Sequence, residues 1–216
     1  MAFTKTQVIQ LYERRARHYD TTANLYYALG FRETPYRKKA VEALHLHEGD
    51  TVVELGCGTA LNFSFLEKAV GPRGRIVGVD LTARMLDVAL KRIERRGWDN
   101  VKLVREDAAR YRFPRQVDGI LSTLALTLIP EYDAIIRRAS AALPPGKRLV
   151  LLDLQQPPWL PGWLLDRIIP LVRPFGVTAD LAERHAWESV VRHFKHHTKQ
   201  DYFGGIVYLA VGWNGP

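Results

Sequence analysis

The sequence predicts an α/β fold built on a doubly wound, seven-stranded sheet that is mostly parallel. Three observations support this prediction. Between residues 50 and 153, short apolar runs alternate with segments of helical spacing, which is typical of parallel strands joined by helices. Two strand-like segments flank Gly204-Gly205, as expected for a C-terminal antiparallel hairpin. Helical segments precede the first apolar run.

The parallel strands are expected at five apolar runs without polar alternation, a pattern that suits burial on both faces of a sheet. These runs are 51–55, 75–79, 101–105, 117–122 and 148–153. The hairpin strands are expected at 192–201 and 205–213. Two or three helices should precede the sheet, and Thr34-Pro35 is a suitable cap and first-turn pair for the helix that carries 37–44.

Two helices are expected between strands. Leu86, Ala89, Leu90 and Ile93 recur at helical spacing behind Thr82, a plausible N-cap, so residues 83–96 should form an amphipathic helix that ends at Gly97. A second helix, at about 131–143, is bounded by proline on both sides.

Length and composition indicate one soluble domain. A chain of 216 residues with 47% hydrophobic and 25% charged residues is ordinary for a single globular unit. We expect a helical lid at 1–48, a core at 49–153, an insertion at 154–190 and the terminal hairpin at 191–216. The single cysteine, Cys57, excludes an intrachain disulfide, and the first residues lack the apolar core of a secretory signal. Cytoplasmic residence is the resulting expectation.

The net charge of +8 is unevenly placed, with basic clusters at 37–39, 95–96 and 192–199. Such clusters attract nucleic acid or an anionic membrane surface. The alternative for each cluster is a solvated face that favours solubility.

The segment Val-Val-Glu-Leu-Gly-Cys-Gly at 52–58 predicts a crevice that binds a nucleoside. Gly56 and Gly58 allow a tight turn against a ligand. Asp80 follows Gly56 by 24 residues, close to the offset of about 20 at which a carboxylate meets ribose hydroxyls in such folds. Leu61 stands where a dinucleotide site has its third glycine, and no Gly-Lys-Ser or Gly-Lys-Thr follows. The expected ligand therefore carries ribose without phosphate.

The stretches VVELGCGTALN, GVDLTARML and REDA resemble the class I S-adenosylmethionine-dependent methyltransferases over roughly residues 36–153. The resemblance implies a Rossmann-like fold, S-adenosyl-L-methionine as cofactor and S-adenosyl-L-homocysteine as product. Ala60 stands where many relatives have glycine, which we expect to be tolerated if the backbone there is helical.

In an open parallel sheet, ligands bind beyond the carboxyl ends of the strands, so the residues at these ends are the expected cofactor site. The first loop should face the amino-acid part of the cofactor, and the acid after the second strand should face the ribose. Asp107 matches the family position that contacts adenine, although it could simply cap a turn. The expected cofactor-binding residues are Tyr19, Glu54, Gly56, Cys57, Gly58, Thr59, Asn62, Asp80, Leu81, Met85, Asp107, Ala108, Ser122, Thr123 and Leu124.

The acceptor side is expected in the N-terminal aromatic residues. Tyr19 and Tyr26 are the candidates for positioning the acceptor, with packing as the alternative. Tyr19 belongs to a Tyr-Asp pair that recurs in the lipid and quinone methyltransferases that this chain resembles. Cys57 is expected to pack rather than react. His45, His47 and the pair at 196–197 lack a fuller ligand set, so no metal is predicted.

The flanking segments GTALN, STLALTLIP and DLQQPPWLPGW look similar to bacterial lipid headgroup N-methyltransferases, including those that make phosphatidylcholine and betaine lipids. Similarity to ubiquinone and menaquinone C-methyltransferases is more diffuse. The main hypothesis is a peripheral-membrane enzyme that methylates the amine of a lipid headgroup. The alternatives are methylation of a quinone precursor or of a soluble small molecule, and a non-catalytic S-adenosylmethionine-binding module. Methylation of a nucleic-acid base is not expected, because Ser122-Thr123-Leu124 follows strand four in place of the Asn- or Asp-Pro-Pro-aromatic motif used for exocyclic amines. Charge alone supports a role in RNA binding. Residues 157–175 either contact the membrane interface or form a lid over the site.

Overall fold

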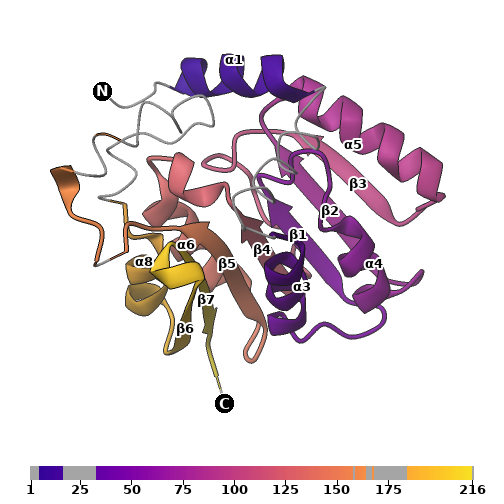
Figure 1. Ribbon diagram of the computed structural model, residues 1–216. Coiled ribbons are helices and arrows are strands. Elements are labelled where there is room, and N and C mark those ends of the chain that lie inside the picture. The colour runs from indigo at the N-terminus through magenta and orange to yellow at the C-terminus, as the bar shows by residue number, and fades with distance from the viewer. Residues whose placement is uncertain (1–4, 17–32, 158, 164–166, 168–183, 216) are drawn as a thin grey trace.

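The computed structural model describes residues 5–16, 33–157, 159–163, 167 and 184–215. Its seven strands form one sheet in the order β3-β2-β1-β4-β5-β7-β6 (Figure 1). The first five strands run parallel, and β7 pairs antiparallel with both β5 and β6. The predicted fold class is confirmed.

The strands are β1 (Thr51–Leu55), β2 (Arg75–Asp80), β3 (Val101–Arg105), β4 (Gly119–Thr123), β5 (Arg148–Leu154), β6 (His196–Tyr202) and β7 (Val207–Trp213). The α-helices of the described residues are α1 (Lys5–Arg15), α3 (Glu33–Ala43), α4 (Phe63–Val70), α5 (Ala83–Arg96), α6 (Tyr132–Ala142) and α8 (Ala186–His193). In the same part of the chain, the short 3-10 helices η2 (Leu126–Leu128) and η5 (Phe203–Gly205) lie in turns.

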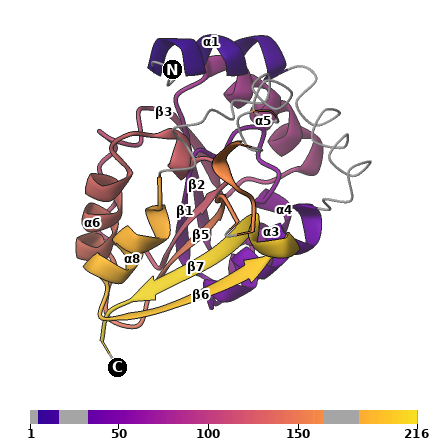
Figure 2. The same cartoon turned by 60° about the vertical axis from the view of Figure 1, so that its left-hand side comes forward.

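Helices cover both faces of the sheet and create two apolar cores (Figure 2). Helices α3, α4 and α5 pack on one face, and α6 and α8 pack on the other. Successive side chains of strand β7 point to opposite faces of the sheet. Val207 and Leu209 therefore join the first core, whereas Tyr208 and Ala210 join the second. The central strands are buried on both faces, which is why their sequences read as unbroken apolar runs.

The strand order places a crevice at the carboxyl end of β1. The chain passes from β1 to β2 on one side and later enters β4 on the other. Loops leaving such neighbouring strands diverge, which opens a ligand site at their carboxyl ends. Helix α1 lies at this edge and contacts α5 (Figure 1).

The end of α5 was predicted correctly, whereas its expected cap behaves differently. Gly97 adopts the left-handed conformation (φ 64°, ψ 39°), and its N–H donates to the carbonyls of Glu94 and Ile93. Thr82 directly precedes the helix, but its side chain makes no capping hydrogen bond. Thr34 and Pro35 already lie within α3, so the expected position of Thr34 before the helix is wrong.

Two other local expectations are corrected. Residues 192 and 193 belong to helix α8, and β6 begins at His196, because Ala186 and Val190 are buried in the core beside α6. Ala60 has φ +63° and is therefore not helical. A left-handed alanine is strained relative to glycine, and Ala60 is held there by its N–H, which donates to the Cys57 carbonyl at 2.9 Å.

The division of the chain into lid, core, insertion and hairpin stays a prediction. Among the described residues, no helix is long and apolar enough to cross a membrane.

Candidate functional site

A cleft lies at the carboxyl ends of β1 to β4, beneath helix α1. It encloses about 870 Å³, including the space that opens to solvent. The loop after β1 borders it, together with the ends of β2 and β3, the turn after β4 and one face of α1. The cleft therefore lies at the crevice that the strand order predicts.

The loop after β1 forms a tight turn against the end of β2. Gly56 and Gly58 have φ values of +68° and +53°, a region that glycine enters without steric cost. The N–H groups of Gly56 and Cys57 donate to the Val79 carbonyl at 2.8 and 3.1 Å. A Cβ at Gly56 would clash with the Cβ of Ala125, whereas a Cβ at Gly58 would meet nothing within 4 Å. Gly58 thus leaves room beside the cleft.

Asp80 joins this loop to the start of α5. Its Oδ2 accepts a hydrogen bond from the Gly58 N–H at 2.9 Å, and its Oδ1 accepts one from the Thr82 N–H at 2.8 Å. Burial raises the pKa of Asp80, and the hydrogen bonds from Thr82 and Gly58 oppose that rise. Asp80 is also one of the residues that line the cleft. Asp80 is therefore positioned to face a ligand while it holds the loop.

The ends of β2 and β3 provide an apolar wall and two acids. Leu81, Met85 and Ala108 line the cleft, as do Glu106 and Asp107. The Oδ1 of Asp107 accepts a hydrogen bond from the Ala109 N–H at 2.9 Å. Asp107 thus caps a turn and borders the cleft at the same time, so the two interpretations of this residue are compatible.

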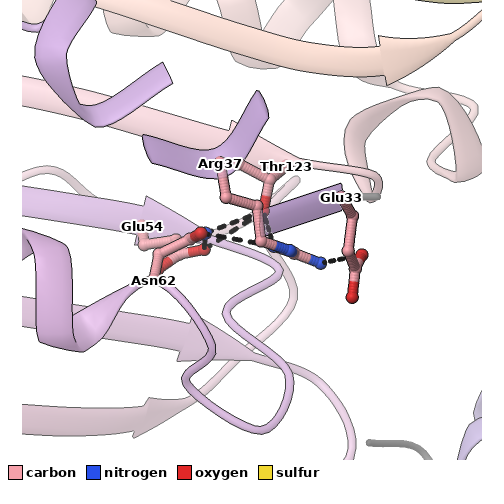
Figure 3. A network of polar contacts seen from close by, with 5 residues as sticks. All are labelled: Glu33, Arg37, Glu54, Asn62 and Thr123. Carbon is pink, nitrogen blue, oxygen red and sulfur yellow. Dashed lines mark hydrogen bonds and ion pairs between the residues drawn. The ribbon is translucent and has the colours of Figure 1, made fainter. Parts of the chain in front are cut away.

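A buried polar network lies behind the loop, between α3, β1 and β4 (Figure 3). Asn62 Nδ2 donates to Glu54 Oε1 at 2.5 Å and to Thr123 Oγ1 at 2.8 Å. Arg37 donates from Nη1 to Thr123 Oγ1 at 2.6 Å and from Nη2 to Glu33 Oε2 at 3.1 Å. Glu54, Asn62 and Thr123 are absent from the described cleft lining; they support the loop from beneath.

Burial raises the pKa of Glu54 to about 7, while Asn62, Arg37 and Thr123 oppose the rise. Its Oε2 accepts no hydrogen bond from the described residues. The raised pKa favours the protonated form of this carboxyl group, which lowers the cost of burying it.

Three further residues expected at the site are buried. Cys57, Thr59 and Ser122 are at most 5% exposed. Burial raises the pKa of the Cys57 thiol well above its usual range, which disfavours a reactive thiolate. Leu124 has φ +55° and donates its N–H to the Leu152 carbonyl at 2.7 Å. On this side, Ala125 and the turn that follows it line the cleft instead of residues 122–124.

Several cleft residues were missed by sequence reasoning. These are Val8, Ile9 and Tyr12 of α1, together with Val79, Thr82, Glu106, Ala125, Leu128, Ile129 and Pro130. The only signal for α1 was the helical spacing of its apolar residues, which does not say where the helix packs. Glu13 anchors it, since its Oε2 lies 3.3 Å from Arg84 Nε of α5. Tyr19 and Tyr26 lie outside the described residues.

Within the part of the chain that the structure describes, no three His, Cys, Asp or Glu side chains are grouped to hold a metal. The ring of His196 stacks on Trp213, with 5.5 Å between the ring centroids.

Comparison with known proteins agrees with this site. Residues 52–146 match the family model described as a methyltransferase domain. This range covers the glycine loop, Asp80, Asp107 and the turn after β4.

Relatives and solved structures point the same way. Demethylmenaquinone methyltransferase of Geobacillus stearothermophilus is 29% identical over 70% of this chain and 64% of its own length. For the Listeria welshimeri protein of the same name, 29% identity extends over 59% of this chain and 54% of the relative. The chain thus spans between half and two thirds of these relatives.

Two solved structures share the fold at lower identity. A SAM-dependent methyltransferase from Aquifex aeolicus has a TM-score of 0.61 at 17% identity and covers 82% of this chain and 88% of its own. Geranyl diphosphate C-methyltransferase from Streptomyces coelicolor A3(2), solved with S-adenosyl-L-homocysteine, has a TM-score of 0.64 at 16% identity, with coverage of 84% and 79%.

The fold, the cleft and the match to a methyltransferase domain together confirm the resemblance to class I S-adenosylmethionine-dependent methyltransferases that the motifs of this chain predict.

Proposed function

We propose that this protein methylates the amine of a lipid headgroup at a membrane surface, with S-adenosylmethionine as the methyl donor. The observation that carries the proposal is the cleft itself, in which a glycine loop and Asp80 face an apolar wall beneath α1. The domain match over residues 52–146 supports the donor. The residues on the β4 side of the cleft support the choice of acceptor.

The cleft residues fit the donor. The space beside Gly58 is suited to the methionine part of S-adenosylmethionine. The Asp80 carboxyl group is suited to the ribose hydroxyls. Leu81, Met85 and Ala108 suit an adenine ring. When bound, S-adenosylmethionine supplies a methyl group on a sulfonium that is already a good leaving group. The protein's main contribution is then to hold and orient the two reactants.

The lining on the β4 side favours an amine as acceptor. The described residues there are Ala125, Leu128, Ile129 and Pro130, none of which has an acid or a base. An amine brings its own lone pair once it is neutral, whereas a ring carbon generally needs a base to become nucleophilic. The apolar side chains also exclude water from the reacting groups.

The test is lipid analysis in a bacterial host without methylated phospholipids. Expression of the protein should produce mono-, di- or trimethylated phosphatidylethanolamine, detected by mass spectrometry. An Asp80→Ala variant expressed to the same level should produce none. An unchanged lipid profile with folded protein that binds S-adenosylhomocysteine would refute the lipid acceptor.

The names of the relatives favour a second candidate, methylation of a quinone ring carbon. The two relatives above are both demethylmenaquinone methyltransferases. Purified protein should be offered demethylmenaquinone and phosphatidylethanolamine in separate vesicles with the same labelled donor. Label in the quinone alone would replace the amine proposal with this one.

A further inference from the structure

Three large aromatic side chains face solvent near two turns of the protein. Trp159 and Trp163 are each 62% exposed, and Phe203 is 39% exposed. A single exposed apolar residue is ordinary. Several at one place on a surface indicate a site of interaction.

A hydrogen bond between distant segments brings Trp159 to the turn that contains Phe203. Trp159 Nε1 donates to the Gly204 carbonyl at 2.6 Å, so the indole ring lies against the turn that carries Phe203. Gln155 also links the segments, because its Nε2 donates to the Gly205 carbonyl at 3.0 Å. Trp163 follows four residues after Trp159.

The turn holds Phe203 in a strained conformation. Phe203 has φ +48°, followed by Gly204 at +65° and Gly205 at +87°. A bulky residue in this region is uncommon and costs about 1 kcal/mol or more. The Phe203 side chain is 39% exposed, so full burial in the core does not offset this strain. Strain at an exposed aromatic residue points to a role outside the folded core.

The aromatic residues lie at the same edge of the sheet as the cleft. Strand β7 is antiparallel to β5, and Val207 pairs with Leu154 at the carboxyl end of β5. The turn before Val207 is therefore at that end. The cleft spans the ends of β1 to β4, and the aromatic residues continue the edge beside β5, β7 and β6.

Cations lie beside the aromatic residues. The Arg167 guanidinium is 5.6 Å from the Trp163 ring centroid, and Lys39 Nζ is 4.8 Å from that of Tyr202, which precedes Phe203. The nearby Asp201 carboxylate is paired with Lys199 at 2.6 Å. Aromatic side chains flanked by cations match an anionic bilayer interface, as does the net charge of +8.

We propose that Trp159, Trp163 and Phe203 insert into the interface of an anionic bilayer, with Arg167 and Lys39 at the headgroup level. The inference rests on the proposed function, because it supposes that the acceptor is drawn from the membrane. Docking by this edge brings the carboxyl ends of the strands, and hence the cleft, to the lipid surface.

The test is flotation of the full chain with vesicles of phosphatidylglycerol and phosphatidylcholine. The double variant Trp163→Ser/Phe203→Gly should lower the partition coefficient by about tenfold or more, because two inserted rings are lost. Leu90→Ser removes an apolar residue that is 48% exposed on α5 and should bind like the wild type. Phe203→Gly alone should leave the melting temperature unchanged or higher, since it relieves strain.

Wild-type protein that stays off the vesicles, or a double variant that binds as well as wild type, would overturn the proposed surface. Self-association of the wild type that the double variant abolishes, without vesicle binding, would show that a second copy is the partner instead. Calorimetry with S-adenosylhomocysteine tests cofactor binding, and the lipid product assay tests methylation. Both are independent of vesicle binding, so a failure of the proposed surface can be told apart from a failure of the proposed function. Vesicle binding without any lipid product refutes only the lipid acceptor, and lipid product without vesicle binding refutes only the surface.

Discussion

Arg37 Nη1 donates a hydrogen bond of 2.6 Å to Thr123 Oγ1 and thereby joins helix α3 to the last residue of β4. The same hydroxyl oxygen accepts from Asn62 Nδ2 at 2.8 Å and lies 3.5 Å from Glu54 Oε1. All four residues are at most 6% exposed. The Thr123 hydroxyl is therefore the junction at which α3, β1, β4 and the glycine loop meet.

Removal of this hydroxyl should destabilise the protein. Thr123→Val keeps the shape of the side chain but removes the hydroxyl acceptor that Arg37 Nη1 and Asn62 Nδ2 share, and the loss of these two buried hydrogen bonds costs about 1–3 kcal/mol. Urea denaturation measures the loss. Thr123→Ser restores the hydroxyl and should recover most of it; equal losses in both variants would contradict this role for the hydroxyl.

Glu54 should make stability depend on pH. Its pKa is raised from 4.5 to about 7 by burial, so the folded state binds more protons than the unfolded state between these values. The contribution of Glu54 to the free energy of unfolding is fully present below about pH 4.5 and is lost as the pH rises through about 7. The loss is on the order of 3 kcal/mol. The free energy of unfolding of Glu54→Gln should fall less over this range than that of wild type. The wild type and the variant share all other buried acids. If their free energies of unfolding fell in parallel with pH, Glu54 would not be the source of the pH dependence.

The close approach of Gly56 to Ala125 predicts a compensating pair. Gly56→Ala should destabilise the protein by about 2 kcal/mol or more, because its Cβ meets that of Ala125 and its φ is +68°. Adding Ala125→Gly removes the clash but not the strain. Thermal denaturation of the single and double variants should show partial recovery, and additive losses would exclude the contact as the cause.

Asp80→Asn should weaken cofactor binding. The substitution replaces one acceptor oxygen by a donor, which then opposes the N–H of Gly58 or Thr82. We expect the affinity for S-adenosylhomocysteine, measured by calorimetry, to fall about tenfold or more, which corresponds to about 1.4 kcal/mol.

Asp118→Asn is the matched control for this substitution. Asp118 Oδ2 accepts a hydrogen bond from the Thr51 N–H at 2.9 Å, at the opposite end of β1. Its loss should lower stability without changing affinity. Equal affinity losses in the two variants would mean that Asp80 acts only through stability.

The strands and the main helices could be predicted because their signals are local. Apolar runs bounded by turn residues placed β1, β2 and β3 within a residue, and Gly97 ended α5 where expected. The segment at 192–201 was misjudged because its division into the end of α8 and strand β6 depends on how Val190 packs against the core. No property of those residues alone shows this packing.

The sequence by itself determined the order of the described strands and helices, the glycine loop, Asp80 and the resemblance to S-adenosylmethionine-dependent methyltransferases, since these depend on residue types at short spacing. Only the tertiary structure decided which residues face the cleft and which support it. It placed Glu54, Asn62 and Thr123 in a buried network with Arg37, and it brought Tyr12 and Ile129 to the cleft. It also brought Trp159 to the turn of Phe203. Such contacts join segments that are distant in the chain, and their formation depends on the packing of whole helices and strands.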